Sequence, residues 1–308
     1  MIALRPAAQR LYGELWPGSA FPAALTAALD RLERSAWPEI VATWSLLTPS
    51  GFPIEYTAGP PGSSPRWTAE LAGPELPEAE RLAVGAALLA ADGPAVPARL
   101  LTALSELQRD TRLRYGTWLG GGVTNRKIYA ELPHACDADV LSEAPLPAPL
   151  RTFLRHLPSA SLPRILAVDA PMRRIELYAR LPVADLTELT SLFHALDCPG
   201  ALRCLGRLPD GLGRLRGRRL GLSVATESNI DTSESPRDGS ELTLFVTART
   251  MFPTASDLLP TLAPQISGIT RTQRPGLVTL RLDPDGGSPA IAVGVTPTVP
   301  THVPSLDH

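Results

Sequence analysis

The sequence predicts an α+β fold, a ten-stranded antiparallel β-barrel with a solvent-filled lumen and an outer layer of helices in repeated αββα units. Three observations predict it. One hairpin alternates with one or two helices five times, at roughly 60 residues per unit. Strands joined only by hairpins are antiparallel, which disfavours a doubly wound parallel sheet. Each hairpin carries one aliphatic and one polar face, and closing such strands into a barrel removes both sheet edges.

The N-terminal half contains the first two repeats. Apolar residues spaced three and four apart predict helices over 2–16, 22–36, 77–92 and 97–113. Turn residues between β-rich runs predict a first hairpin from 40–47 and 53–58, a further short strand over 66–71, and a second hairpin from 117–125 and 126–132.

The C-terminal half continues the same order. The predicted strands pair as 163–170 with 173–181, 220–228 with 241–249, and 276–283 with 289–297. The predicted helices are a broken one over 137–158, then 184–197 and 254–268, with an irregular Gly- and Arg-rich stretch over 199–220. Residues 1–298 are expected to form a single barrel domain, followed by a disordered tail over 299–308.

Side-chain alternation assigns the two faces of the sheet. In the strand over 174–180, Arg174, Glu176, Tyr178 and Arg180 share one face, and aliphatic residues share the other. The same division places Lys127, Tyr129 and Glu131, then Thr243, Phe245, Thr247 and Arg249, and then Thr279 and Arg281, on the polar face. We expect this face to line the lumen, with Ile175, Leu177, Leu244 and Val246 under the helices. The alternative is an open sheet with its polar face in water.

Composition excludes several classes of protein. Charged residues make up 19% and the net charge is −2, so there is no basic field for nucleic acid or an anionic membrane surface. No apolar run approaches the length of a membrane span, and the N-terminus lacks a secretory signal pattern. Cys136, Cys198 and Cys204 have no metal or disulfide spacing, so we expect a cytoplasmic protein. Only Lys127 among the 29 basic residues is lysine, a bias typical of a GC-rich bacterial genome.

Local motifs resemble a known family. Five hairpins with helices outside is the layout of the aromatic prenyltransferases of the ABBA type, and the motifs are most similar to the dimethylallyltryptophan synthase branch. These motifs are SGFPIEYTAG with SPRWTAEL eleven residues on, RKIYAELP, RRIELYARLP and the closing VTLRLDPDGGSPAIAVGVTP. The resemblance covers residues 40–297 and implies transfer of a prenyl group, in secondary metabolism, from dimethylallyl or a longer prenyl diphosphate to an indole, another electron-rich aromatic molecule or a peptide.

The chemistry of that transfer defines the residues it needs. Ionisation of an allylic diphosphate releases an anion that cationic donors must meet, and Arg66, Lys127, Arg174, Arg249 and Arg281 are the candidates. Aromatic faces stabilise a carbocation and exclude water, and Tyr129, Tyr178 and Phe245 are the expected shield. The resemblance implies that Glu55 contacts the N–H of the acceptor, where a carboxylate also assists proton removal.

The sequence departs from the family pattern at several positions. Glu176 stands where the family has lysine, Thr243 and Phe245 replace a polar residue and a tyrosine, and Ala292 and Gly294 lie where a tyrosine is expected. Glu176 also allows a simple ion pair with Arg174 on the same face. These departures leave open a second hypothesis, a non-catalytic barrel of the same fold that binds an anionic or aromatic ligand.

No motif predicts a metal site or a bound cofactor. The chain has no DDxxD-like cluster, so magnesium-bridged binding of the diphosphate is not expected. Gly120, Gly121 and Gly122 are more typical of a strand kink than of a phosphate loop. His134, His156 and His194 have no triad or metal spacing.

Overall fold

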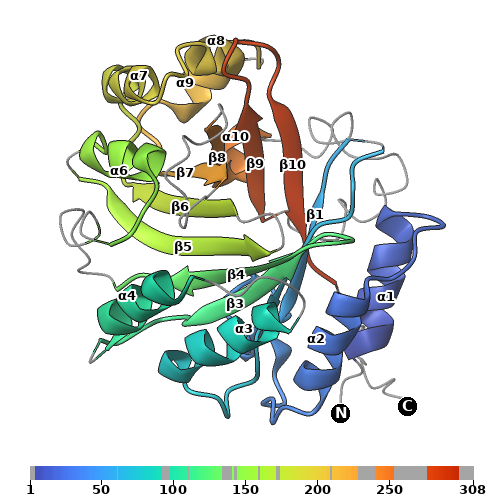
Figure 1. Cartoon of the computed structure of the whole chain (residues 1–308). Helices are drawn as coiled ribbons and strands as arrows, with labels where there is room; N and C mark the ends of the chain where they lie inside the picture. Colours follow the sequence, from blue (N-terminus) through green and yellow to red (C-terminus); the bar gives the residue numbers. More distant parts are fainter. Residues whose placement is uncertain are drawn as a thin grey trace.

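The computed structural model is a closed barrel of ten antiparallel strands with helices around it (Figure 1). It describes residues 4–60, 62–91, 97–109, 111–133, 141, 144–158, 160–170, 174–208, 210–227, 240–252 and 276–297. Each strand pairs with its neighbour in sequence, and β1 pairs with β10 to close the barrel. The predicted fold class is therefore confirmed, and the open sheet is excluded.

The strands form five consecutive hairpins. Their bounds are β1 Ile54–Ala58, β2 Trp67–Glu70, β3 Thr117–Gly121, β4 Arg126–Glu131, β5 Leu162–Ala170, β6 Arg174–Leu181, β7 Leu220–Glu227, β8 Glu241–Thr247, β9 Leu277–Leu282 and β10 Ala290–Val295. Closure runs through the pairing of Tyr56 with Val295 and of Ala58 with Val293. Because the barrel is closed, each described strand has a hydrogen-bonded neighbour on both sides.

The described helices lie outside the barrel (Figure 1). They are α1 Leu4–Leu15, α2 Ala23–Glu33, η1 Val41–Thr43, η2 Glu78–Glu80, α3 Arg81–Ala90, α4 Ala98–Gln108, α6 Ala148–Arg155, α7 Leu186–Ala195, α8 Ala201–Gly206, α9 Gly211–Leu215 and α10 Ala248–Met251. Helix α7 begins where the Asp185 carboxylate accepts hydrogen bonds from the backbone N–H groups of Thr187 and Glu188. This cap satisfies donors that the first helical turn leaves free.

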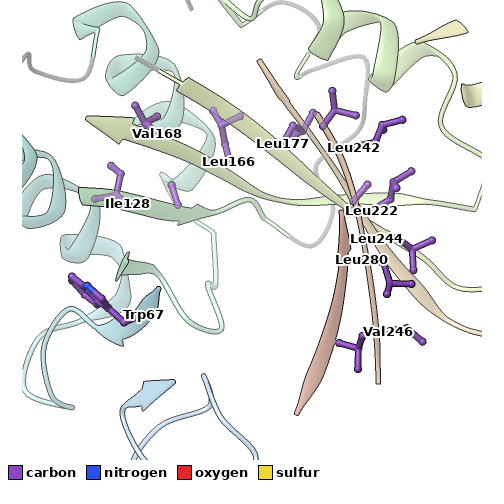
Figure 2. Close-up of a cluster of buried hydrophobic side chains, with 14 of the residues drawn as sticks. Trp67, Ile128, Leu166, Val168, Leu177, Leu222, Leu242, Leu244, Val246 and Leu280 are labelled. Atoms are coloured by element: carbon purple, nitrogen blue, oxygen red, sulfur yellow. The ribbon is translucent and has the colours of Figure 1, made fainter. Parts of the chain in front are cut away.

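The hydrophobic core lies between the barrel and the helices. Figure 2 shows aliphatic side chains along the outer face of the sheet, among them Leu177, Leu244 and Leu280. Leu177 and Leu244 are 0% exposed, Ile175 is 1% exposed and Val246 is 2% exposed. The predicted outward face is thus confirmed. Burial at roughly 25 cal/mol per Å² of apolar area makes this layer the main stabilising contact between sheet and helices.

Three predicted elements are wrong. Residues 40–47 form the short helix η1 and turns instead of a strand, because both edges of β1 are already paired, with β2 and with β10. The first hairpin therefore joins 54–58 to 67–70. Helix α4 ends at Gln108 rather than at 113, and the stretch over 199–220 contains α8 and α9.

Other predicted elements lie partly or wholly outside the described residues. These are the helix over 254–268, the tail over 299–308 and the first part of the broken helix over 137–158. Within the described ranges, no helix is both long and apolar enough to cross a membrane.

Candidate active site

The lumen is a cavity of about 880 Å³ that opens within the barrel. This volume falls in the range of small-molecule sites, roughly 300–1,000 Å³. Predicted site residues that line it are Glu55, Arg66, Lys127, Tyr129, Arg174, Tyr178, Phe245 and Arg281. The alternation of polar and aliphatic residues along the strands therefore places these side chains on one surface.

The strand order separates two mouths of the cavity. In a closed antiparallel barrel, odd strands begin and even strands end at the same mouth. Arg66 precedes β2, Lys127 and Arg174 lie at the starts of β4 and β6, and Arg281 lies near the end of β9. These four belong to one mouth, which we call the mixed-charge end. Glu55 lies at the start of β1, toward the opposite mouth.

Lys127 forms a buried ion pair at the mixed-charge end. Its ammonium group donates to Glu176 Oε2, and its side chain is 9% exposed, against 7% for that of Glu176. The hydroxyl of Ser223 donates to Glu176 Oε1 at 2.6 Å. Burial opposes ionisation of Glu176, but Lys127, Ser223 and Arg174 outweigh it and lower its pKa to about 2. Burial likewise opposes the charge on Lys127, and the Glu176 carboxylate nevertheless raises its pKa.

A second, more exposed network continues around the same mouth. Arg174 contacts Glu241 at 2.9 Å, and Arg281 Nη1 lies 4.0 Å from the same carboxylate. The predicted pairing of Arg174 with Glu176 is therefore replaced by Arg174 with Glu241 and Lys127 with Glu176. The Arg66 side chain makes no hydrogen bond or ion pair with the residues that the structure describes, so its guanidinium group can meet an anion.

Five aromatic rings form a belt across the middle of the lumen. Adjacent ring centroids lie 5.3 Å apart for Tyr115 and Trp118, 6.4 Å for Trp118 and Tyr129, 6.0 Å for Tyr129 and Tyr178, and 5.4 Å for Tyr178 and Phe245. We call these five residues the aromatic belt. The Lys127 ammonium lies 4.8 Å from the ring centroid of Tyr129 and 5.6 Å from that of Tyr178, so two rings already contact a cation.

The Glu55 carboxyl group occupies space left by two glycines. A Cβ atom on Gly294 would lie 2.7 Å from Glu55 Cδ, and one on Gly276 would lie 3.1 Å from Glu55 Oε2. The small residue at position 294 therefore makes room for this carboxyl group. No hydrogen bond joins it to another described residue, and burial raises its pKa to about 7. A carboxyl group with that pKa exchanges protons near neutral pH.

Two residues predicted on the lumen face lie elsewhere. Strand β8 ends at Thr247, so Arg249 is an exposed residue of helix α10 and does not line the cavity. The Glu131 carboxylate accepts hydrogen bonds from the backbone N–H groups of Arg114 and Gly116 instead of facing the lumen. Gly116 has φ +74°, and a Cβ there would lie 2.5 Å from the Glu78 carbonyl oxygen, so this turn requires glycine.

The sequence analysis missed two members of the belt and a group of arginines. Trp118 pairs with Tyr129 across β3 and β4, and this register would have placed it on the lumen face. Arg114, Arg164 and Arg219 line the cavity together with Arg180, at the mouth toward which Glu55 lies. Their positions in the sequence, close to the ends of predicted strands, could have indicated that they lie at a mouth of the barrel. Within the described ranges, no group of three or more His, Cys, Asp or Glu side chains is placed to hold a metal ion.

Comparison with solved structures finds matches over most of the chain at low sequence identity. The 5-dimethylallyltryptophan synthase from Streptomyces coelicolor aligns with a TM-score of 0.67 at 17% identity, over 95% of this chain and 96% of that one. This chain has the fold of the aromatic prenyltransferases. A 6-dimethylallyl tryptophan synthase aligns with a TM-score of 0.62 at 18% identity, over 95% of each chain.

Another match is a ligand complex. NotF, solved with brevianamide F and DMSPP, aligns with a TM-score of 0.55 at 11% identity, over 89% of this chain and 87% of that one. No family model and no curated protein matches the sequence. The likeness is therefore one of fold.

Proposed function

We propose that this protein is a cytoplasmic aromatic prenyltransferase. It would move a prenyl group from dimethylallyl or a longer allylic diphosphate to an indole or another electron-rich aromatic acceptor, without a metal ion. One observation carries the proposal: a single cavity combines cations at one mouth, the aromatic belt in its middle and Glu55 toward the other mouth. The buried thiols of Cys198 and Cys204 form no disulfide, which is in keeping with a reducing compartment.

The mixed-charge end is the proposed seat of the diphosphate. Arg66, Lys127, Arg174 and Arg281 supply guanidinium and ammonium donors from β4, β6 and β9 and from the residue that precedes β2. As the C–O bond of the donor breaks, negative charge develops on the leaving pyrophosphate, and these fixed cations stabilise it. Arg66 contributes most readily, because it has no partner to release among the described residues.

The aromatic belt is the proposed shield of the allylic cation. Tyr129, Tyr178 and Phe245 lie directly beyond the cations, and their ring faces stabilise positive charge while keeping water out. Water that reached the cation would convert it to an alcohol. Trp118 extends the shield toward Glu55 and increases the apolar area available to a flat acceptor.

Glu55 is the proposed base. Attack by the acceptor forms the bond to the prenyl carbon and leaves the acceptor with one proton too many. The Glu55 carboxylate takes that proton from an N–H or O–H of the acceptor, and its pKa near 7 suits the transfer at neutral pH. Similar structures have been solved with DMASPP and Trp and with brevianamide F and DMSPP, which supports a site that takes a prenyl donor together with an aromatic acceptor.

A specific observation favours a second candidate, a barrel that binds a ligand without turnover. Glu176 already neutralises Lys127, and Glu241 already neutralises Arg174. A binding site whose cations are already paired with carboxylates attracts a diphosphate less strongly than a site whose cations are unpaired.

Incubation with allylic diphosphates distinguishes the two candidates. Purified protein is mixed with dimethylallyl or geranyl diphosphate and a panel of indoles, naphthols and aromatic peptides, and both pyrophosphate release and prenylated product are measured. Acceptor-dependent release is expected, together with a large loss in Arg66→Ala. Diphosphate binding without product from any acceptor would support the ligand-binding barrel instead.

A further inference from the structure

Four arginines surround the mouth of the barrel toward which Glu55 lies. Arg114 precedes β3, Arg164 lies near the start of β5, Arg180 lies near the end of β6, and Arg219 precedes β7. All four line the same cavity. We call them the arginine rim.

The arginine rim lacks the acids found at the mixed-charge end. Its guanidinium groups form no ion pair with the residues that the structure describes, and Arg164 Nη1 is buried without a hydrogen-bond partner. The Arg114 guanidinium also lies 5.0 Å from the ring centroid of Tyr115. A buried donor without a partner costs stability unless a ligand satisfies it.

The arginines also repel one another. Partial burial lowers the pKa of Arg180, and the positive charges of Arg219, Arg164 and Arg114 lower it further. Like charges gathered at one mouth raise the local concentration of anions there. The arrangement is therefore an anion site whose counterion is not supplied by the described part of the chain.

The position of the rim relative to Glu55 indicates which molecule it meets. In the closed order of ten strands, β6 is five strands from β1, so Arg180 and Glu55 stand on opposite walls. An aromatic ring whose N–H or O–H points to Glu55 extends across the lumen toward the rim. The donor diphosphate, in contrast, belongs to the other mouth, beyond the aromatic belt.

We propose that the arginine rim binds the anionic part of an aromatic acceptor that carries at least two negative charges, such as two carboxylates or a phosphate. This inference rests on the proposed function, because it takes the rim and Glu55 to be parts of one acceptor site. A single carboxylate pairs fully with one guanidinium fork, whereas four unpaired guanidinium groups match a more highly charged group. Acceptor choice is thus set by charge as well as by ring shape.

A series of naphthols of rising charge tests the proposal. The probes are 2-naphthol, 2-naphthol-6-sulfonate and 2-naphthol-3,6-disulfonate, whose own fluorescence reports binding. The disulfonate is expected to bind at least about tenfold more tightly than the neutral naphthol at low salt, as charge-assisted hydrogen bonds are worth roughly 1.5–3 kcal/mol each. Salt should reduce the difference.

Two variants and a matched control locate the effect. Arg164→Gln and Arg180→Gln should each weaken disulfonate binding about tenfold and leave 2-naphthol binding unchanged. Arg99→Gln changes an exposed arginine of α4 outside the cavity and should change neither. Equal affinity for the three naphthols, or equal losses in Arg99→Gln and Arg180→Gln, would overturn the proposal.

Two further measurements separate the possible failures. If Arg180→Gln weakens binding of inorganic pyrophosphate as much as Lys127→Ala does, the rim is a diphosphate-binding site and the assignment to the acceptor is overturned.

Prenylation is assayed in parallel with dimethylallyl diphosphate. Charge-dependent naphthol binding without any product would reject the prenyltransferase and keep the anion site. Product from 2-naphthol with charge-independent binding would keep the prenyltransferase and reject the anion site.

Discussion

Replacing Glu176 by glutamine tests whether the buried ion pair controls the proposed diphosphate-binding site. The change keeps an oxygen that can accept from Ser223 but leaves the charge of Lys127 unpaired in a site where both side chains are under 10% exposed. Breaking a buried pair in this way costs about 3–5 kcal/mol. We expect Glu176→Gln to lower the free energy of unfolding by about that much, measured by urea denaturation.

The same change should strengthen the binding of inorganic pyrophosphate. In the wild type, Lys127 must give up its contact with Glu176 to meet an anion, and the carboxylate also repels that anion. In Glu176→Gln, pyrophosphate becomes the counterion of Lys127. One charge-assisted hydrogen bond is worth about 1.5–3 kcal/mol, so calorimetric titration should show binding about 10- to 100-fold tighter. Pyrophosphate should then restore much of the lost stability.

A matched control and a pH series complete the test. Glu106→Gln removes an exposed carboxylate on α4 and should alter neither quantity. Because the pKa of Glu176 falls from 4.5 to about 2 on folding, its stabilisation is present above pH 4.5 and is lost as the pH falls toward 2. The stability difference between wild type and Glu176→Gln should shrink over that window. The reasoning is refuted if the variant unfolds like Glu106→Gln or binds pyrophosphate no more tightly than the wild type.

Four further changes test the remaining parts of the site and the core. Lys127→Ala should weaken pyrophosphate binding about 10- to 100-fold by calorimetry, and unchanged binding would remove Lys127 from the seat. Glu55→Gln should reduce turnover by roughly 10²–10⁴ with pyrophosphate affinity unchanged. The pKa of Glu55 rises from 4.5 to about 7 on folding, so between these values the folded state holds a proton that the unfolded state releases. The free energy of unfolding of the wild type should therefore fall by up to about 3 kcal/mol as the pH rises through that window. Glu55→Gln should show no such fall. Gly294→Ala places a Cβ 2.7 Å from Glu55 Cδ and should lower turnover without changing pyrophosphate affinity, whereas Gly13→Ala, with nothing within 4 Å, should leave turnover unchanged. Leu177→Ala should cost about 2–5 kcal/mol of stability in urea unfolding, and a loss below 1 kcal/mol would contradict its place in the core.

The fold and the facing of the strands were predictable because they depend on local pattern. The alternation of Arg174, Ile175, Glu176 and Leu177 is set by the pleat of one strand, and the aliphatic members need an apolar partner layer. Residues 40–47 show where local pattern fails. Their β-rich composition predicts a strand, but pairing needs an open edge, and β10, far away in sequence, takes the edge of β1 that they would need.

The partners of the site charges were not predictable, because they depend on register across strands. Lys127 and Glu176 are 49 residues apart and lie on β4 and β6, with β5 between them, so only the assembled barrel brings them together. The prediction that Arg249 faces the lumen was wrong for a different reason. The period of β8 continues for two residues after the backbone has turned into α10 at Ala248, and the sequence does not mark that point.

The pairing of the first strand with the last makes the cavity a late product of folding. While the chain is being synthesised, β1 can pair with β2 but lacks its second neighbour until residues 290–295 have emerged. Until then Gly294, beside which the Glu55 carboxyl group lies, is missing. The side of the barrel opposite the arginine rim is also incomplete, because β10 forms part of it. Contacts of such long sequence separation slow folding and leave a strand edge open to other chains in the meantime. A ribosome-bound chain that ends before β10 would therefore be the form of this protein most in need of a chaperone, and it would not yet enclose the cavity.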